Sequence, residues 1–344
     1  MKLALASLAL PLFHMEAADY AIEKTTADGI AIVKLIDKTH ATEVAVVPSI
    51  GNNAYEMKVH GKNVFWSPYT TLAELKAKPT LQGNPMLAPW ANRIDSTSYW
   101  ANGKKYRLNE GLGNLRMDGF KQPIHGLLAF TQEWVVTEAK ADGKSAWVTS
   151  RLEFWKYPDW MAQFPFAHSI EMTYRLSAGV LEVATTIENH SLEPMPVSIG
   201  FHPYYQLHDA PRDEWKVRLG ASEQMALSPA LVPTGEKKPN PYAEPLALKD
   251  VALDDVFSGL RRGANGHAEL SVEGKNQKLT VEFGPRYQVA VVYSPKGRNF
   301  ICFEPMSGPT NAFNLAHEGK YGELQSVPAG GKWKESFWIK PGGF

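Results

Sequence analysis

The stretch FAHSIEMTYRLSAGVLEVATTIE, residues 166–188, decides the fold class. Apolar and polar residues broadly alternate over residues 166–176 and again over residues 180–188. This alternation is typical of strands that bury one face against a core and leave the other face in solvent. The dipeptide Ala178-Gly179 separates the two runs and is a turn signal. The stretch therefore predicts an antiparallel hairpin in a half-buried sheet.

The same signals recur along the chain. Asn102-Gly103 and Asp142-Gly143 each separate two strand-like runs, and they predict two further hairpins. Short β-branched and aromatic runs predict more strands, and they lie at residues 30–36, 42–47, 195–200, 279–283, 288–293, 300–304 and 336–339. Because these runs extend from one end of the chain to the other, we predict an all-β fold, a large antiparallel β-sandwich.

Helices and long loops are expected at only a few places. Helical patterns cover residues 71–78 and 318–324. The Pro-containing stretches 80–89 and 229–245 are expected to be long loops, which commonly carry function in a β-sandwich. A length of 344 residues fits one large domain or two small ones. No linker, repeat or charge block divides the sequence, and we therefore expect one domain over residues 19–344.

The first residues resemble an export signal. Met1-Lys2 gives a positive start, and an apolar run follows from Leu3 to Phe13. That run has the length of a signal-peptide core and is too short to span a bilayer. We therefore predict that residues 1–18 are a signal peptide and that the protein is exported, to the periplasm or outside the cell. If the segment is instead a buried first strand, the protein is cytoplasmic.

Charge and cysteine content exclude several classes of partner and site. The chain has 36 Lys plus Arg and 36 Asp plus Glu, so no net field attracts nucleic acid or a membrane surface. Cys302 is the only cysteine, which excludes an internal disulfide and a Cys-based zinc cluster. Its apolar neighbours predict a buried thiol. No nucleotide or metal motif is present, so we expect no cofactor and no metal. The sequence gives no signal for an oligomeric state.

Five polar residues stand in strongly apolar or Pro-rich surroundings, where an unpaired polar group is costly. They are Arg93, His125, His202, Asp254 and Glu304. Each has a purely structural interpretation when it is taken alone. An arginine here would pair with a nearby carboxylate such as that of Asp95, a histidine before Gly or Pro would be a satisfied structural residue, and a carboxylate at a strand end would be a cap.

Taken together, the segments around these residues resemble the motifs of the aldose 1-epimerase superfamily in order and spacing. The matching segments are PWANRI (89–94), IHGLL (124–128), GFHPYY (200–205), LDDVF (253–257) and FEPMSGPTNAFN (303–314). The similarity extends from about Ile30 to the C-terminus. It implies the galactose mutarotase-like form of the β-sandwich and an isomerase that interconverts the α and β anomers of a free sugar.

The resemblance also implies a role for each residue. Glu304 would be the catalytic base and His202 the catalytic acid, and general acid–base catalysis of ring opening suits a carboxylate and an imidazole near neutral pH. His125, Arg93 and Asp254 would bind the sugar. A guanidinium and a carboxylate suit a polyol, since one donates and the other accepts hydrogen bonds.

Two assignments stay open among neighbouring residues. Asp255 competes with Asp254, which we prefer because it stands three residues before Phe257, as in the family motif. Aromatic residues also bind the apolar face of sugars, and Trp90, Trp160 and Tyr204 are candidates, although most aromatic side chains in the chain must belong to the core.

The motifs depart from those of the best-known galactose mutarotases. Phe-His-Pro-Tyr-Tyr replaces an Asn-His-Ser-Tyr-type segment, and Glu-Pro-Met replaces a Gln-His-type one. The reaction type therefore transfers from the family, but galactose or glucose specificity does not. A related hexose-6-phosphate 1-epimerase is an alternative that needs extra cations, for which Arg116, Lys121 and Arg286 are available. A signal peptide argues against that substrate. The alternative from another class is a carbohydrate-binding sandwich without catalysis.

Overall fold

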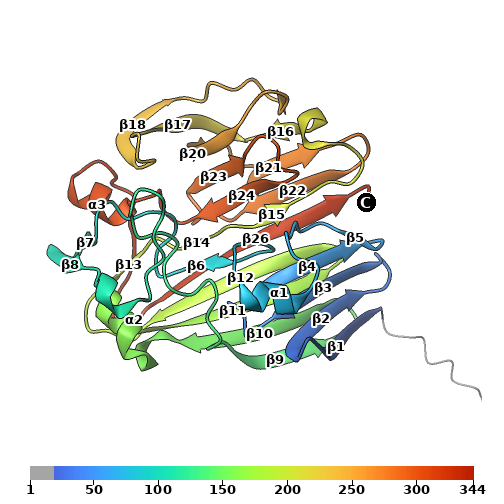
Figure 1. The fold of residues 1–344 in the computed structure, drawn as a ribbon, viewed down its shortest axis with the longest axis horizontal. Coiled ribbons are helices and arrows are strands. Elements are labelled where there is room, and N and C mark those ends of the chain that lie inside the picture. The colour runs from blue at the N-terminus through green and yellow to red at the C-terminus, as the bar shows by residue number, and fades with distance from the viewer. Residues whose placement is uncertain (1–18) are drawn as a thin grey trace, which may run out of the picture.

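The computed structural model describes residues 19–344, and the predicted signal peptide, residues 1–18, lies outside the described residues. The described chain forms three large sheets and two strand pairs, all paired antiparallel (Figure 1). The predicted all-β sandwich is therefore confirmed.

The sheets differ in size and in the part of the chain that they use. The five-stranded sheet has the order β1 (Tyr20–Ala27), β2 (Ile30–Asp37), β3 (Thr42–Val47), β4 (Asn53–Val59) and β5 (Lys62–Asn63). The nine-stranded sheet has the order β19 (Leu246–Ala247), β16 (Lys216–Arg218), β21 (Ala268–Glu273), β22 (Lys278–Phe283), β26 (Lys332–Gly342), β12 (Val180–Asn189), β11 (His168–Ser177), β10 (Ala146–Glu153) and β9 (Val135–Ala141).

The eight-stranded sheet has the order β18 (Pro233–Pro239), β17 (Ala221–Leu227), β20 (Leu253–Leu260), β23 (Val289–Ser294), β24 (Ile301–Met306), β14 (Gly200–Phe201) and β6 (Met86–Leu87), with β15 (Tyr204–Tyr205) also paired to β24. The two strand pairs are β7 (Ser98–Ala101) with β8 (Lys104–Arg107) and β13 (Met195–Val197) with β25 (Gln325–Val327). Helices are short: α1 (Leu72–Ala77), α2 (Pro158–Gln163) and α3 (Ala312–His317), with 3₁₀ turns at Glu110–Leu112, Phe154–Lys156 and Arg212–Glu214.

The hairpin predicted from residues 166–188 is β11 and β12. Ser177 pairs with Val180, so that Ala178 and Gly179 form a two-residue turn, both with positive φ. That conformation matches the right-handed twist of the strands and is costly for Ala178. The amide of Ala178 donates to the Tyr20 hydroxyl at 2.9 Å, which helps to hold the turn. The hairpins predicted at Asn102-Gly103 and Asp142-Gly143 are β7–β8 and β9–β10.

The two predicted helices and one of the predicted loops differ in outcome. The helix predicted at residues 71–78 is α1, which Thr71 and Glu74 begin with a capping box. The helix predicted at residues 318–324 is wrong, because α3 lies earlier and Gly319, with φ of 71°, ends it. The loop predicted at residues 229–245 is wrong in part, because it contains β18, an edge strand that tolerates proline.

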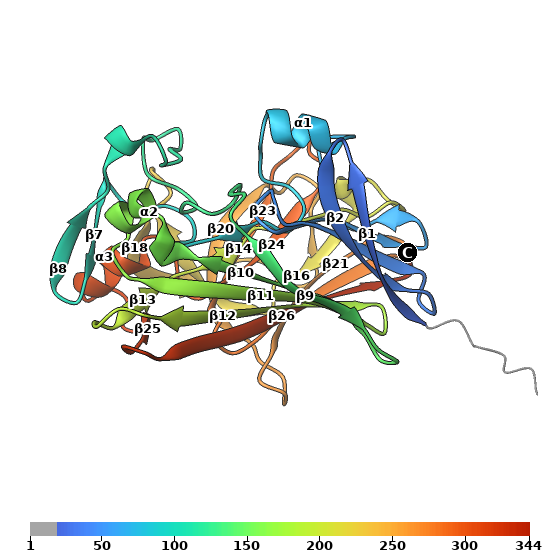
Figure 2. The same ribbon diagram turned by 90° about the horizontal axis from the view of Figure 1, so that it is seen from below.

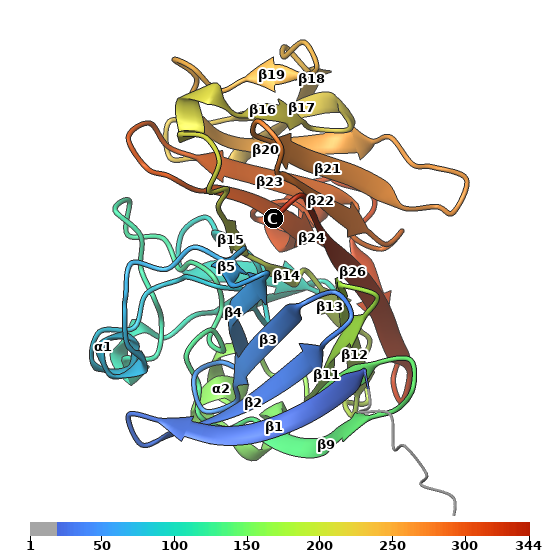
Figure 3. The ribbon, with the colours of Figure 1, turned by 90° about the vertical axis from the view of Figure 1, so that its right-hand side faces the viewer.

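The nine-stranded sheet backs the other two sheets. Its β9–β11 end contacts β1 and β2 of the five-stranded sheet. Its central strand β26 contacts the eight-stranded sheet, where the rings of Phe201 and Phe337 lie 4.9 Å apart. Figure 2 shows β9–β12 and β26 side by side, and Figure 3 shows the strands β16–β24 stacked beyond the N-terminal strands. One buried apolar cluster between the sheets joins residues from Val33 to Ile339.

The outer face of the eight-stranded sheet carries a second, smaller cluster. Alternate residues of β23 and β24, such as Ala290 and Phe303, point into the main core, and their neighbours Val291 and Cys302 point outward. Apolar residues of the segment between β5 and β9, including Leu81 and Ala129, cover this outer face. This segment and the sheet beneath it enclose the site described next.

Candidate active site

The five predicted residues lie together in one cavity of about 170 Å³ on the outer face of the eight-stranded sheet, which Asn92, Ile124, Val291 and Tyr293 also line. Asp254 comes from β20 and Glu304 from β24, and His202 lies between β14 and β15. Arg93 and His125 come from the covering segment, where a bridge joins Arg93 to Ile124. Residues more than 200 positions apart are thus brought to one place.

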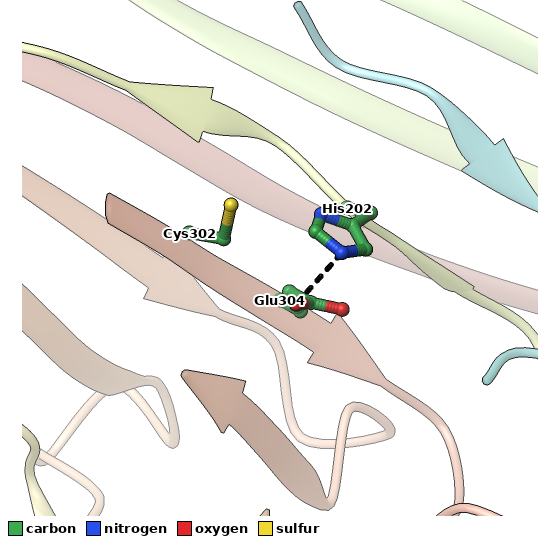
Figure 4. Close-up of side chains that lie close together, drawn as sticks. All are labelled: His202, Cys302 and Glu304. Carbon is green, nitrogen blue, oxygen red and sulfur yellow. Dashed lines mark ion pairs between the residues drawn. The ribbon is translucent and has the colours of Figure 1, made fainter. Parts of the chain in front are cut away.

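The central pair is His202 and Glu304. Nε2 of His202 lies 3.2 Å from Oε1 of Glu304, and both side chains are buried (Figure 4). The His202 amide donates to the Pro85 carbonyl at 3.0 Å, and its ring stacks on Tyr204 at 4.7 Å and 11°. These contacts hold the imidazole over the β24 carboxylate.

Both members of this pair lack a full set of hydrogen bonds. The 3.2 Å approach of Nε2 to Oε1 does not have the geometry of a hydrogen bond, so neither carboxylate oxygen of Glu304 has a hydrogen-bond partner among the described residues, and Nδ1 of His202 also has none. Unsatisfied buried polar atoms are costly and uncommon in folded proteins. Such atoms at the wall of a cavity are therefore available to a ligand that brings hydroxyl groups.

Burial shifts the pKa of both groups toward their uncharged forms. The pKa of Glu304 is raised well above its usual value, by desolvation first and then by the nearby Asp254. The pKa of His202 is lowered to about 3, mainly by desolvation, with Arg116 and Arg93 adding to the effect. The sugar-free pair therefore favours a protonated carboxyl beside a neutral imidazole, and it holds one proton in total.

His125 lies beside His202, with the two rings edge to face at 5.4 Å. It has φ of 66°, and Gly126 follows with φ of 63°. A Cβ added to Gly126 would lie 2.1 Å from the Ala88 carbonyl oxygen, so only glycine fits there. The pKa of His125 is lowered well below its usual value by desolvation and then by His202. A neutral His125 can donate or accept a hydrogen bond from a sugar.

Arg93 is held by two neighbours. Its Nε donates to Oδ2 of Asp118 at 2.7 Å, and its Nη1 donates to Oδ1 of Asn92 at 3.1 Å. The structural interpretation of Arg93 is thus partly right, although the carboxylate is that of Asp118 and not Asp95. Burial alone would raise the pKa of Asp118, but hydrogen bonds from Gln122 and Arg93 hold it below its usual value. Arg93 also lines the cavity.

The choice between the two adjacent aspartates follows from strand alternation. Asp254 pairs with Tyr293 in the β20–β23 ladder, and both residues line the cavity. Asp255 points to the other side, where Gln224 donates to its Oδ1 at 2.7 Å. The geometry agrees with the preference for Asp254.

This difference gives a matched pair of variants. Asp254→Asn is expected to raise KM for a sugar substrate about tenfold, because a charged acceptor for hydroxyl groups is lost. In Asp255→Asn the side-chain oxygen can still accept the hydrogen bond from Gln224, so KM should stay within about twofold of wild type. Initial rates of anomer equilibration at several sugar concentrations measure both values. Equal effects of the two substitutions would remove Asp254 from sugar binding.

Cys302 lies two residues before Glu304 on β24 and is buried, as predicted (Figure 4). Ligand atoms of Cys302, His202 and Glu304 lie within 4.8 Å of one another, which is a spacing that a metal ion could use after a small adjustment. A thiolate is the form that binds metal. The pKa of Cys302 is raised well above its usual value by burial, then by Glu304 and Asp254, so the protonated thiol is favoured.

Sequence reasoning missed three residues of the site. Asn92 and Asp118 orient Arg93, and Tyr293 lines the cavity. Asn92 stands inside the quoted PWANRI segment, but nothing local connects Asp118 or Tyr293 to it. Among the aromatic candidates, Trp90 is buried away from the cavity, Trp160 lines a neighbouring cavity and Tyr204 stacks on His202.

Comparisons with known proteins identify the family and the fold. The model of the aldose 1-epimerase family matches residues 34–340. The chain belongs to the aldose 1-epimerase family. It is 28% identical over 236 residues to the uncharacterized protein YihR of Escherichia coli (strain K12), which covers 67% of this chain and 71% of YihR.

Solved structures of similar fold cover nearly the whole chain. A galactose mutarotase-like protein from Clostridium acetobutylicum has a TM-score of 0.83 at 21% identity and covers 95% of this chain and 99% of its own. Galactose 1-epimerase from Lactobacillus acidophilus NCFM has a TM-score of 0.72 at 15% identity, with coverage of 94% and 99%. At these identities the likeness shows the family's fold. Within residues 19–344, no helix has the length and apolar character needed to cross a bilayer.

Proposed function

We propose that this member of the aldose 1-epimerase family interconverts the α and β anomers of a free sugar by general acid–base ring opening. The observation that carries the proposal is the buried His202–Glu304 pair, which faces a cavity together with three polar residues suited to hydroxyl groups. A carbohydrate-binding protein needs groups that hold hydroxyls, but it does not need a buried acid and base in contact. The pair therefore supports catalysis over binding alone.

The reaction requires that the C1–O5 bond breaks, that the aldehyde turns about C1–C2, and that the ring closes on the other face. With the sugar bound, the single proton of the pair first moves from Glu304 to His202. The Glu304 carboxylate then takes the proton of the C1 hydroxyl while the His202 imidazolium gives its proton to O5, and these transfers reverse on closure. O1 and O5 are both bonded to C1, so two groups 3.2 Å apart can reach them together. The pair holds one proton throughout, and no proton has to come from solvent.

Polarimetry tests this proposal directly. Freshly dissolved α-glucose and α-galactose are followed at low temperature with and without the purified protein. We expect equilibration of at least one sugar in the panel to be faster than in buffer, in proportion to protein concentration. Rates equal to those in buffer for every sugar would leave only a binding function.

The pKa shifts predict an unusual pH dependence. The pair gains a second proton only below the lowered pKa of His202 and loses its single proton only above the raised pKa of Glu304. We therefore expect kcat/KM to show no inflection near pH 6.5, where an ordinary imidazole titrates, and its acid limb to lie below that pH. Rates corrected for buffer-catalysed equilibration at each pH give the profile. An acid limb centred near pH 6.5 would contradict the buried, uncharged form of His202.

Arg116 favours a second candidate, a sugar that carries an anionic group such as phosphate. It lines, with His125, a cavity of about 530 Å³ beside the site, and no described carboxylate pairs with it. Lys121 and Arg286, the other cations considered, line neither this cavity nor the site. The relative kcat/KM for glucose and glucose 6-phosphate decides between the two candidates.

A further inference from the structure

A third cavity adjoins the site on the side of Tyr293. It has a volume of about 460 Å³, compared with about 170 Å³ for the site itself, and Tyr293 lines both. Glu304, which lines the site cavity, is buried on β24. A substrate that extends beyond one sugar ring therefore has open space next to the site.

The lining of this cavity is rich in aromatic rings. Trp66, Tyr204, Tyr293 and Phe300 line it. The rings of Trp66 and Phe300 lie 4.6 Å apart, and those of Trp66 and Tyr204 lie 5.7 Å apart, so the rings support one another. Trp66 and Tyr293 are only partly buried, although large apolar side chains are usually covered. Rigid, partly exposed aromatic faces suit the C–H faces of a pyranose ring.

The polar part of the lining also suits a sugar. Lys78, Thr80 and Arg298 line the same cavity, together with Tyr69, and no carboxylate does. The hydroxyl of Tyr69 already donates to the Lys78 carbonyl, so it fixes this side of the cavity. Ammonium, guanidinium and hydroxyl groups all donate hydrogen bonds, and a ring with several hydroxyl oxygens accepts them.

The chemistry of the reaction fixes the direction in which a substrate extends. Ring opening places C1 of the reacting sugar at Glu304 and His202, which are both buried. The part of the sugar distant from C1 then lies away from this pair. A second sugar joined through that part has to lie outside the site cavity, and the aromatic cavity adjoins it at Tyr293, which lines both.

We propose that the cavity lined by Trp66, Tyr204, Tyr293 and Phe300 is a subsite for the second ring of a reducing disaccharide. This inference rests on the proposed anomer interconversion. The reacting ring occupies the site cavity, and the second ring packs on the aromatic faces. Its hydroxyl groups accept hydrogen bonds from the polar side chains of the rim.

Two variants test the subsite without changing the acid–base pair. Trp66→Leu removes an aromatic face. Thr80→Trp places a large side chain in the cavity, because Thr80 is a partly buried residue of its lining. Trp155→Leu is the matched control, because Trp155 is 48% exposed and lines neither cavity. The substrates are glucose as the single ring and maltose, cellobiose, lactose and isomaltose as disaccharides with a glucose reducing end.

We expect wild type to equilibrate at least one disaccharide, with kcat/KM for it falling about tenfold in both subsite variants. In those variants kcat/KM for glucose should change less than twofold, and Trp155→Leu should change neither value. Because Thr80→Trp leaves the aromatic cluster intact, it remains informative if Trp66→Leu fails to fold.

The inference is overturned if no disaccharide is equilibrated, or if the disaccharide-to-glucose ratio stays at the wild-type value in the folded variants. It is also overturned if only glucose 6-phosphate loses rate, since the cavity would then bind an anion. Absence of acceleration for glucose and for every disaccharide refutes the proposed function itself, which is a distinct result.

Discussion

Glu304→Gln is expected to lower kcat for anomer equilibration by about a hundredfold or more, the usual contribution of a positioned general base. Glutamine has the same shape as the carboxyl group but cannot take the C1 hydroxyl proton. Both oxygens of Glu304 are without hydrogen-bond partners in the sugar-free site, so few protein contacts are lost. The rate is measured by polarimetry after subtraction of the buffer rate.

Thermal unfolding provides the control for this variant. Because burial raises the pKa of Glu304, the folded protein binds a proton that the unfolded chain releases above the usual glutamate value. Folding stability therefore falls as pH rises through that range, and glutamine removes the loss. The variant should be at least as stable as wild type, most clearly at alkaline pH. A stable variant with a wild-type rate would remove Glu304 from the mechanism.

His202→Asn is the second substitution with a large expected effect, again about a hundredfold or more in kcat. Asparagine donates hydrogen bonds but cannot transfer a proton to O5. The His202 backbone contact to Pro85 does not depend on the side chain, so the fold around it should persist. Polarimetry at saturating sugar measures kcat, and circular dichroism checks the fold.

Combining the two substitutions separates a joint role from two independent ones. His202 and Glu304 act together in the ring-opening step, so loss of either one disables that step. The double variant should therefore lose little more rate than either single variant. Multiplied losses in the double variant would mean that His202 and Glu304 act in separate steps.

The strands and hairpins were predictable because their signals are local. Alternation along β11 and β12 marks the buried face, and a short turn such as Ala178-Gly179 fixes which residues pair. The short helix α1 was also predictable, because Thr71 and Glu74 form a capping box, but α2 has no such side-chain cap and was missed. Helix α2 has six residues and begins at Pro158, a length at which tertiary packing rather than helical pattern decides the structure.

The five residues predicted for the site were found through their motifs, and the structure places all of them around one cavity. The other residues of the site, Asp118 and Tyr293, were not predictable, because their positions depend on contacts between segments that are far apart in the sequence. Asp118 reaches Arg93 across the covering segment, and Tyr293 meets Asp254 through the β20–β23 ladder. The aromatic cavity depends on the same long-range packing, since Trp66 and Phe300 are more than 200 residues apart.

Exchange NMR at equilibrium tests the central claim most directly. Magnetisation transfer between the α and β anomeric protons of a sugar reports the interconversion rate without any change in composition. We predict exchange that increases with wild-type protein, and an increase that is smaller by about a hundredfold or more with the same amount of the double variant His202→Asn/Glu304→Gln. Exchange that wild type does not accelerate for any sugar, or that the folded double variant accelerates equally, would contradict the assignment of anomer interconversion to this pair.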